Sequence, residues 1–265
     1  MQLKQSVRAL MIGLGVLAVL GLAFGNKAAL FAAMRAGGYT SLQLNQPLAQ
    51  VILTPSKDNT LYQSTGAQFS NGAGENLFVG NTNSRAARRT LIAFDIAGQL
   101  PADATIISVT LQLQMSKTNA GAQSISLHRL QSDWGEGTSD AADNEGSGTT
   151  PTTGDATWLY RFFDTQNWQT PGGNFVLTDT ATITVNNVGF YTWHSPQMAA
   201  DVQSWLNTPA TNFGWLLLGN ETQASSAKRF SAKENSTVAN RPQLTIVYQS
   251  ATPLFRFVYL PLVQK

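Results

Sequence analysis

Apolar and polar residues alternate along much of the chain after residue 42, with the two-residue period of a β-strand. In the clearest stretch, Thr105–Met115, the apolar positions are Val109, Leu111, Leu113 and Met115. Ser124–Leu130 alternates in the same way. Because successive side chains of a strand point to opposite faces, each stretch places one face toward a core and the other toward water.

Further short strands recur at 8–15-residue intervals and are separated by turns rich in Gly, Pro and Asn. They are Gln50–Thr54, Asp58–Tyr62, Asn76–Val79, Arg88–Ile96, Thr157–Phe163, Ala181–Val185, Phe190–Trp193, Phe213–Leu218, Lys228–Ala232 and Gln243–Tyr248. Within this region, Ser195–Leu206 alone predicts a helix, with Ser195 as its cap and Pro196 in its first turn. The pattern predicts an all-β fold, an antiparallel β-sandwich or jelly roll with one short helix.

The first 36 residues read as a targeting segment. Lys4 and Arg8 precede residues 9–25, which are apolar throughout. This is the pattern of a signal peptide, with a cut before Asn26, or of a retained anchor helix, since these 17 residues reach the lower limit for a membrane span. Either interpretation predicts a protein that is secreted or tethered to the outer face of the cell membrane. The expected division is 1–36 signal peptide or anchor plus linker, 37–250 β-sandwich, and 251–265 C-terminal apolar strand or tail.

Composition narrows the chemistry. Charged residues make up 12% of the chain, the net charge is +2, and there is no cysteine. The absence of cysteine excludes disulfides, thiolate metal sites and a cysteine nucleophile. The basic residues are scattered, and their densest cluster, Arg85, Arg88 and Arg89, is too small to track a phosphate backbone. No nucleic-acid partner is therefore expected.

Residues 131–155 interrupt the strand pattern and hold six of the fifteen acidic residues. Asp133, Glu136 and Asp155 offer the hard oxygen ligands that Ca²⁺ prefers, so this loop is a candidate calcium site. The alternative is a solvated loop without a metal. Paired carboxylates can also act as the acid and base of a glycosidase, but nothing in this Gly-rich stretch predicts the rigid opposed placement that such catalysis needs.

No catalytic set is predicted. His128 and His194 are the only histidines, and no G-x-S-x-G nucleophile motif accompanies them. Of the six tryptophans, Trp134 and Trp168 lie in loops rich in Gly, Pro and polar residues, where exposed rings could stack on sugars. These two are the candidate ligand-binding residues, and the other four are assigned to the core.

Several motifs occur in one collinear order over residues 50–249. They are TLIAFDI (90–96), LPADATIISVTLQL (100–113), DWGEG (133–137), GDATWLYR (154–161), WQTPGGNF (168–175), MAADVQSWL (198–206), NFGWLLLGNE (212–221), FSAKE (230–234) and RPQLTIVY (241–248). In this order the chain resembles the DNRLRE domain family, which is also catalogued as a carbohydrate-binding module family. The resemblance implies an exported β-sandwich without a transferable catalytic set.

These observations favour an exported, non-catalytic surface domain that binds polysaccharide or a cell-envelope glycan. One alternative is a structural surface or matrix protein that self-associates through its C-terminal apolar strand, Leu254–Val263, since unpaired strand edges invite pairing. The other alternative is a polysaccharide hydrolase or lyase. Calcium is the one candidate cofactor, and contact with the membrane is expected only through the N-terminal segment.

Overall fold

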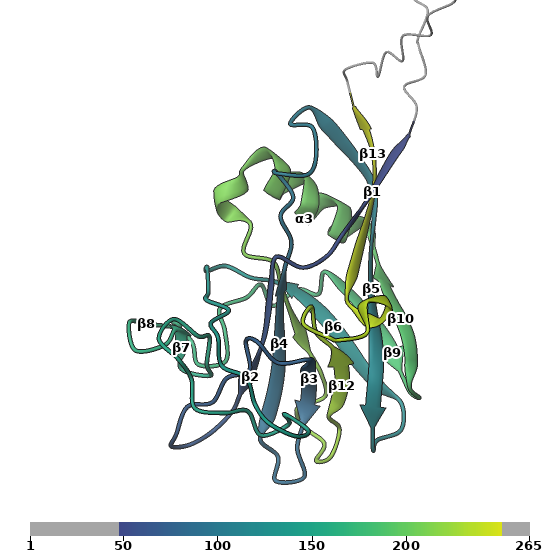
Figure 1. Ribbon diagram of the computed structural model, residues 1–265. Helices are drawn as coiled ribbons and strands as arrows, with labels where there is room; N and C mark the ends of the chain where they lie inside the picture. Colours follow the sequence, from purple (N-terminus) through teal and green to yellow (C-terminus); the bar gives the residue numbers. More distant parts are fainter. Residues whose placement is uncertain (1–47, 251–265) are drawn as a thin grey trace, which may run out of the picture. The chain divides into compact units, whose positions relative to one another are not determined.

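The computed structural model describes residues 48–250, which form a β-rich body with one α-helix (Figure 1). The elements are β1 (Ala49–Leu53), β2 (Lys57–Tyr62), β3 (Asn76–Asn81), β4 (Ala87–Ala93), β5 (Ala104–Thr118), β6 (Gln123–Arg129), β7 (Tyr160–Phe162), β8 (Gln166–Asn167), β9 (Ala181–Val185), β10 (Gly189–His194), α3 (Pro196–Asn207), η1 (Pro209–Thr211), β11 (Trp215–Leu218), β12 (Lys228–Ser231), η2 (Val238–Asn240) and β13 (Gln243–Ser250).

Eleven strands form one curled antiparallel sheet, in the order β1-β13-β5-β12-β3-β4-β11-β6-β9, with β10 paired to β5 and β2 paired to β4. Strand β3 connects the two halves, because Asn76–Val79 pair with β12 whereas Gly80 and Asn81 pair with β4. Gly80 has a φ of 105°, a backbone conformation that residues with a Cβ rarely adopt. The sheet therefore folds over itself at β3 and faces itself as two layers.

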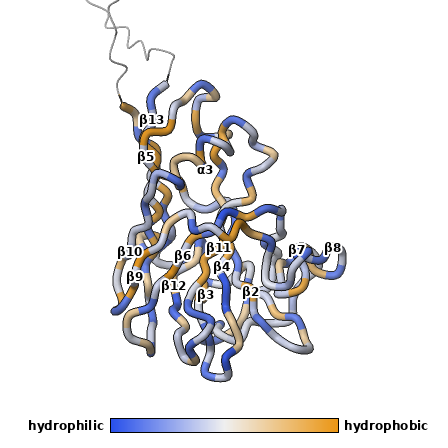
Figure 2. The backbone as a smooth tube through the Cα atoms, turned by 180° about the vertical axis from the view of Figure 1, so that it is seen from behind, coloured by the Kyte–Doolittle hydropathy of each residue, from blue (hydrophilic) through white to orange (hydrophobic). Residues whose placement is uncertain are grey.

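The main core lies between these two layers. Leu111, Leu113 and Met115 of β5 are fully buried together with Leu127 of β6 and Trp215 of β11. These β5 residues are the inward positions of the alternation seen in the sequence. In Figure 2 the hydrophobic segments lie mainly along the strands. Burial of apolar side chains from both layers is the main stabilising contribution to the fold.

The helix α3 begins where the sequence predicts. The Ser195 hydroxyl accepts a hydrogen bond from the Met198 backbone N–H at 3.0 Å, and a proline lies in the first turn. The buried Asp201 carboxylate joins the helix to the sheet by accepting hydrogen bonds from Trp215 Nε1 and Thr180 Oγ1, each at 2.9 Å. Trp205 packs on Trp215, with ring centroids 4.6 Å apart. The helix is thus held by apolar packing and by a buried polar contact.

A second core cluster covers the outer face of one layer. The segment between β6 and β9 contributes Trp134, Trp158 and Trp168, which pack on outward-facing residues of β4 and β11 such as Leu91 and Leu216. Both strands are therefore buried on both faces. Their continuous apolar runs, TLIAF and WLLL, are typical of such strands.

The predicted fold class is confirmed for the described residues. The strand expected over Thr157–Phe163 shortens to β7, because Trp158 turns into the second core cluster instead of pairing in a sheet. The predicted N-terminal helix and the C-terminal strand lie outside the described residues. Among residues 48–250, the structure contains no helix long and apolar enough to span a bilayer.

Candidate functional site

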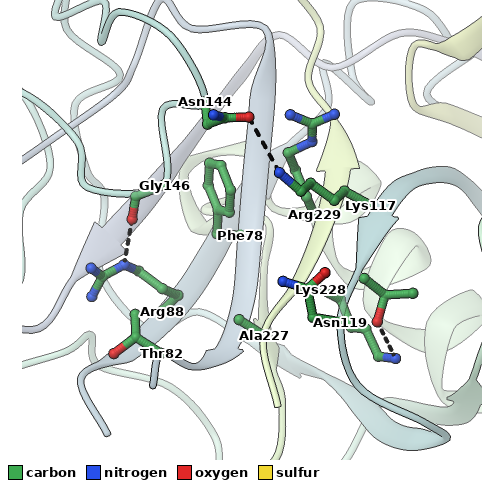
Figure 3. Close-up of a pocket in the computed structure, with 11 residues that line it drawn as sticks. Phe78, Thr82, Arg88, Lys117, Asn119, Asn144, Gly146, Ala227, Lys228 and Arg229 are labelled. Carbon is green, nitrogen blue, oxygen red and sulfur yellow. Dashed lines mark hydrogen bonds between the residues drawn. The ribbon is translucent and has the colours of Figure 1, made fainter. Parts of the chain in front are cut away.

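A shallow groove of about 210 Å³ opens beside strands β3, β5 and β12 (Figure 3). Its lining residues are Phe78, Thr82, Arg88, Lys117, Thr118, Asn119, Asn144, Gly146, Ala227, Lys228 and Arg229. The volume is below the roughly 300 Å³ of pockets that enclose a ligand. A groove of this size suits one unit of a polymer that lies across the surface.

Sheet register places three of the lining residues in a row. Arg229 of β12 lies opposite Phe78 of β3 on one side and opposite Lys117 of β5 on the other. Residues directly opposite one another in a sheet project from the same face. Two cations therefore stand side by side next to an aromatic ring, although like charges in this position destabilise a sheet.

Arg88 is held on the other side of the groove. Its Nε donates to the Gly146 carbonyl at 3.2 Å, and its Nη1 donates to the Ala87 carbonyl at 3.0 Å. The guanidinium lies over the ring of Tyr62, 4.8 Å from the centroid. Burial lowers the pKa of Arg88 from its usual value, but an arginine starts so high that it stays charged at neutral pH. The groove thus has a fixed cation on this wall.

Lys228 borders the groove, but its side chain points to the opposite face of β12 from Arg229, because adjacent residues of a strand alternate between faces. There it is almost fully buried. Its ammonium contacts four oxygens, namely Thr118 Oγ1 at 2.8 Å and the carbonyls of Ala120, Gly121 and Asn186 at 2.9, 2.6 and 3.2 Å. These neutral acceptors satisfy the hydrogen bonds of the ammonium and leave its charge uncompensated. Burial lowers the pKa of Lys228.

No carboxylate balances these cations. All fifteen acidic residues of the chain lie within residues 48–250, and none of them lines the groove. The ion pairs of the described region use other basic residues, such as Lys57 with Asp133 and Arg89 with Glu221. The groove therefore concentrates positive charge on a domain in which acidic residues are common.

One wall of the groove comes from the acidic loop and is held there by Glu145. The Glu145 carboxylate is buried and accepts from Asn71 Nδ2 at 2.7 Å, from Asn76 N and Nδ2 at 2.8 and 3.0 Å, and from Glu75 N at 3.3 Å. Its φ is 59°. These contacts place its neighbours Asn144 and Gly146 in the groove wall, where Asn144 Oδ1 accepts from Lys117 at 3.3 Å.

The expectation that Trp134 and Trp168 are exposed sugar platforms is wrong. The two side chains are 1% and 4% exposed, and their Nε1 groups donate to the carbonyls of Phe213 and Thr157. Both indoles cover apolar residues on the outer face of β4 and β11, so neither ring face is free to stack on a sugar. The other four tryptophans are buried, as expected.

The structure does not bring Asp133, Glu136 and Asp155 together, so this ligand set is also wrong. Asp133 pairs with Lys57 at 2.7 Å, and Asp155 is fully buried with its Oδ2 accepting from Thr152 N at 2.7 Å. Strand pairing and turns instead carry Glu136 to a different cluster. Its carboxylate lies with those of Asp58 and Glu234, with one oxygen of each within 4.8 Å of the others.

This cluster already contains a cation, the ammonium of Lys233, which contacts both Glu136 and Glu234. Asp58 is buried and accepts a hydrogen bond from the Lys233 backbone N–H at 2.9 Å. Burial and the charge of Glu234 raise the pKa of Asp58 well above its usual value, and burial also raises the pKa of Glu136. Calcium binding by the acidic loop stays a prediction, which thermal melts with calcium and with EDTA test.

Replacing Asp58 with asparagine is expected to raise the melting temperature at pH 7 by a few °C. A carboxyl with a raised folded-state pKa binds its proton more tightly when folded, so stability falls as pH rises from about 3.9 to the folded value. Asp58→Asn removes this charge and keeps an acceptor for the Lys233 N–H. Calorimetry across pH 4–8 would measure both the gain and a flatter pH dependence. The exposed Asp140→Asn is the control, and a lower melting temperature for Asp58→Asn at pH 7 would contradict the prediction.

His128 has serine and aspartate neighbours but not in the order of a catalytic triad. Ser126 Oγ lies 2.9 Å and Asp179 Oδ1 3.4 Å from the same ring nitrogen, Nε2. Nδ1 lies 2.9 Å from the Val176 carbonyl. In a triad the acid binds the nitrogen opposite the serine, so that the histidine can accept the serine proton. This constellation therefore ties the β6–β9 segment to the sheet.

One comparison bears on the groove. Residues 49–153 match the profile of carbohydrate-binding module family 96. The matched segment runs from β1 into the acidic loop, and it contains Phe78, Arg88 and Lys117 as well as Asn144. Residues 49–153 are thus similar to a carbohydrate-binding module, and the resemblance to such a module is confirmed over this segment. The DNRLRE name stays a prediction. No curated protein matches the chain.

The family 96 match does not extend to β12, which supplies Lys228 and Arg229. Sequence reasoning missed the groove because its residues come from four separate stretches of the chain. One signal was present: Lys117 is the one charged residue of β5, and Lys228 and Arg229 are adjacent in β12. The common face of Lys117 and Arg229 depends on a strand pairing that no local pattern reveals.

Proposed function

We propose that this protein is an exported, non-catalytic domain that binds acidic polysaccharide in the groove of Arg88, Lys117 and Arg229. The observation that carries the proposal is three cations in one groove without a carboxylate, two of which, Lys117 and Arg229, reach the surface. The match to family 96 supports carbohydrate as the ligand, and the targeting pattern of residues 1–36 supports export.

The groove chemistry fits a sugar acid. Uronate carboxylates and sulfate esters accept charge-assisted hydrogen bonds from guanidinium and ammonium groups, which are stronger than neutral ones. Arg229 and Lys117 offer such donors at the surface. Thr82, Asn119 and Asn144 offer donors and acceptors for sugar hydroxyls, and Phe78, which is 8% exposed, adds a small apolar contact. A neutral sugar would leave the positive charges of the groove uncompensated, because their protein partners are neutral oxygens.

Isothermal titration of the protein with a polyuronate, a sulfated glycan and a neutral β-glucan tests this function. We expect the two acidic polymers to bind and the neutral one not to bind. Affinity should fall as NaCl is raised, because salt screens charges at an exposed groove. Inorganic polyphosphate serves as a polyanion control and is expected to bind more weakly, since it has neither a sugar ring nor hydroxyl groups for the polar residues of the groove.

Two results would contradict the proposal. Binding of the neutral glucan with the same affinity at every salt concentration would show that the cations do not select the ligand. If the protein binds none of the glycans while its circular dichroism spectrum shows that it is folded, the proposed carbohydrate-binding function is wrong.

A further inference from the structure

Strand β1 lies at one end of the sheet. It pairs with β13 in continuous antiparallel register from Ala49 to Leu53. Its other edge has no strand partner among residues 48–250. Unpaired N–H and C=O groups along such an edge form a template for a further strand.

The edge lacks the features by which proteins usually prevent such pairing. The sequence AQVIL of β1 contains neither charge nor proline, and its register with β13 contains no bulge. Two apolar side chains on its outward face, Leu48 and Ile52, are 59% and 55% exposed. Ile107 of β5 lies at the bulge where β5 pairs with β13, the strand next to β1, and its side chain is 47% exposed. This end of the sheet therefore offers both backbone groups and apolar surface.

The chain itself contains a segment suited to the edge. Residues 254–263, LFRFVYLPLV, are almost entirely apolar and follow the end of β13 after a three-residue connection. The four Cα–Cα steps from residue 250 to residue 254 span about 13–14 Å when extended. The far side of β1 lies two strand spacings, about 9.6 Å, from β13. The chain's own tail would need most of this length to cross β1, and it would then run parallel to β1 because β1 is antiparallel to β13.

We propose that β1 binds residues 254–263 of a second copy of this chain as an added antiparallel strand. A second copy avoids the short connection and allows the antiparallel pairing, which is more stable per residue. The edge and the groove use different parts of β5. Strand β13 pairs with Ala104–Gln112, whereas Lys117 and Thr118 line the groove. Associated copies could thus present several grooves to one polysaccharide, which raises its overall affinity.

Because the chain has no cysteine, single cysteines report this contact directly. Two variants of the full chain are prepared in mild detergent. One carries Ile52→Cys, and the other carries Val258→Cys and an added tag that increases its size. The two are mixed and treated with a short bismaleimide. We expect a mixed dimer, identified by its size on a denaturing gel, in several-fold excess over the dimers that each chain forms alone. In a further experiment the untagged chain carries Gln50→Cys as its crosslinking site, with and without Ile52→Lys. Adding Ile52→Lys should abolish the mixed dimer with the tagged Val258→Cys chain.

Thr184→Cys provides the matched control, since Thr184 is an exposed residue of β9, the strand at the other end of the sheet. Equal crosslinking of Thr184→Cys and Ile52→Cys to the tail, or no crosslink above the single-chain background, would overturn the proposal. A chain with both Ile52→Cys and Val258→Cys is treated at high dilution. Crosslinking within that chain, without dimer, would assign the edge to its own tail and also overturn the proposal.

Discussion

Replacing Lys117 and Arg229 together with glutamine is expected to weaken binding of an acidic polysaccharide by at least about a hundredfold, since each of the two lost hydrogen bonds to a charged group contributes about 1.5–3 kcal/mol. The two side chains lie directly opposite one another on β5 and β12, so their like charges repel in the free protein. The double variant should therefore keep or slightly gain stability while it loses affinity. Isothermal titration and thermal melting measure the two effects.

This combination of results distinguishes a binding role from a structural one. Arg241→Gln is the matched control, because Arg241 lies just before β13, outside the groove, and its Nε bonds to the Asn235 carbonyl. It removes one positive charge and should leave affinity unchanged at constant ionic strength. If the double variant and the control bind equally well, the groove is not the binding site. Loss of affinity together with loss of folding would assign Lys117 and Arg229 to the fold.

Glu145→Gln is expected to lower the free energy of unfolding by roughly 3 kcal/mol, because buried groups left without their partner cost about 1–3 kcal/mol each. Glu145 is an acceptor for four N–H donors of Glu75, Asn71 and Asn76. A glutamine amide would turn one acceptor into a donor that faces these N–H groups. Urea denaturation measures the loss.

The same variant should also weaken binding in protein that is still folded. Glu145 positions Asn144 and Gly146, and it is not itself a lining residue of the groove. Titration at low temperature, where the variant is folded, should show reduced affinity for the acidic polymer. Asp143→Asn is the control, since Asp143 lies in the same loop, has a similar φ of 60° and is exposed. Unchanged affinity of folded Glu145→Gln would show that the loop does not shape the site.

The tryptophans show why aromatic residues in loops are ambiguous from sequence. Trp134 and Trp168 occur among Gly, Pro and polar residues, which is also the composition of many ligand-binding loops. Whether such a ring is exposed depends on the surface beneath the loop. Here β4 and β11 expose apolar side chains on their outer face, and covering them with indoles removes this surface from water. The runs TLIAF and WLLL contained this information, because only strands buried on both faces read as continuously apolar.

The acidic residues show a related effect at longer range. Their clustering in residues 131–155 suggested one shared site, but the loop is held at separate points. Asp133 pairs with Lys57, Glu136 joins Asp58 and Glu234, and Glu145 binds the start of β3. Each carboxylate acts on a partner far away in the chain. Nearness in sequence therefore placed these residues in one loop without placing their carboxylates in one site.

The sequence by itself determined the all-β class, the inward positions of β5 and the start of α3. These features depend on contacts within a few residues: the two-residue period of a strand and the hydrogen bond from the N–H of residue 198 to the Ser195 hydroxyl. Only the tertiary structure decided the groove and the free edge of β1. Both arise from the order and register of strands distant in the chain, which bring Phe78, Lys117 and Arg229 into one row and leave β1 with a single strand neighbour among residues 48–250.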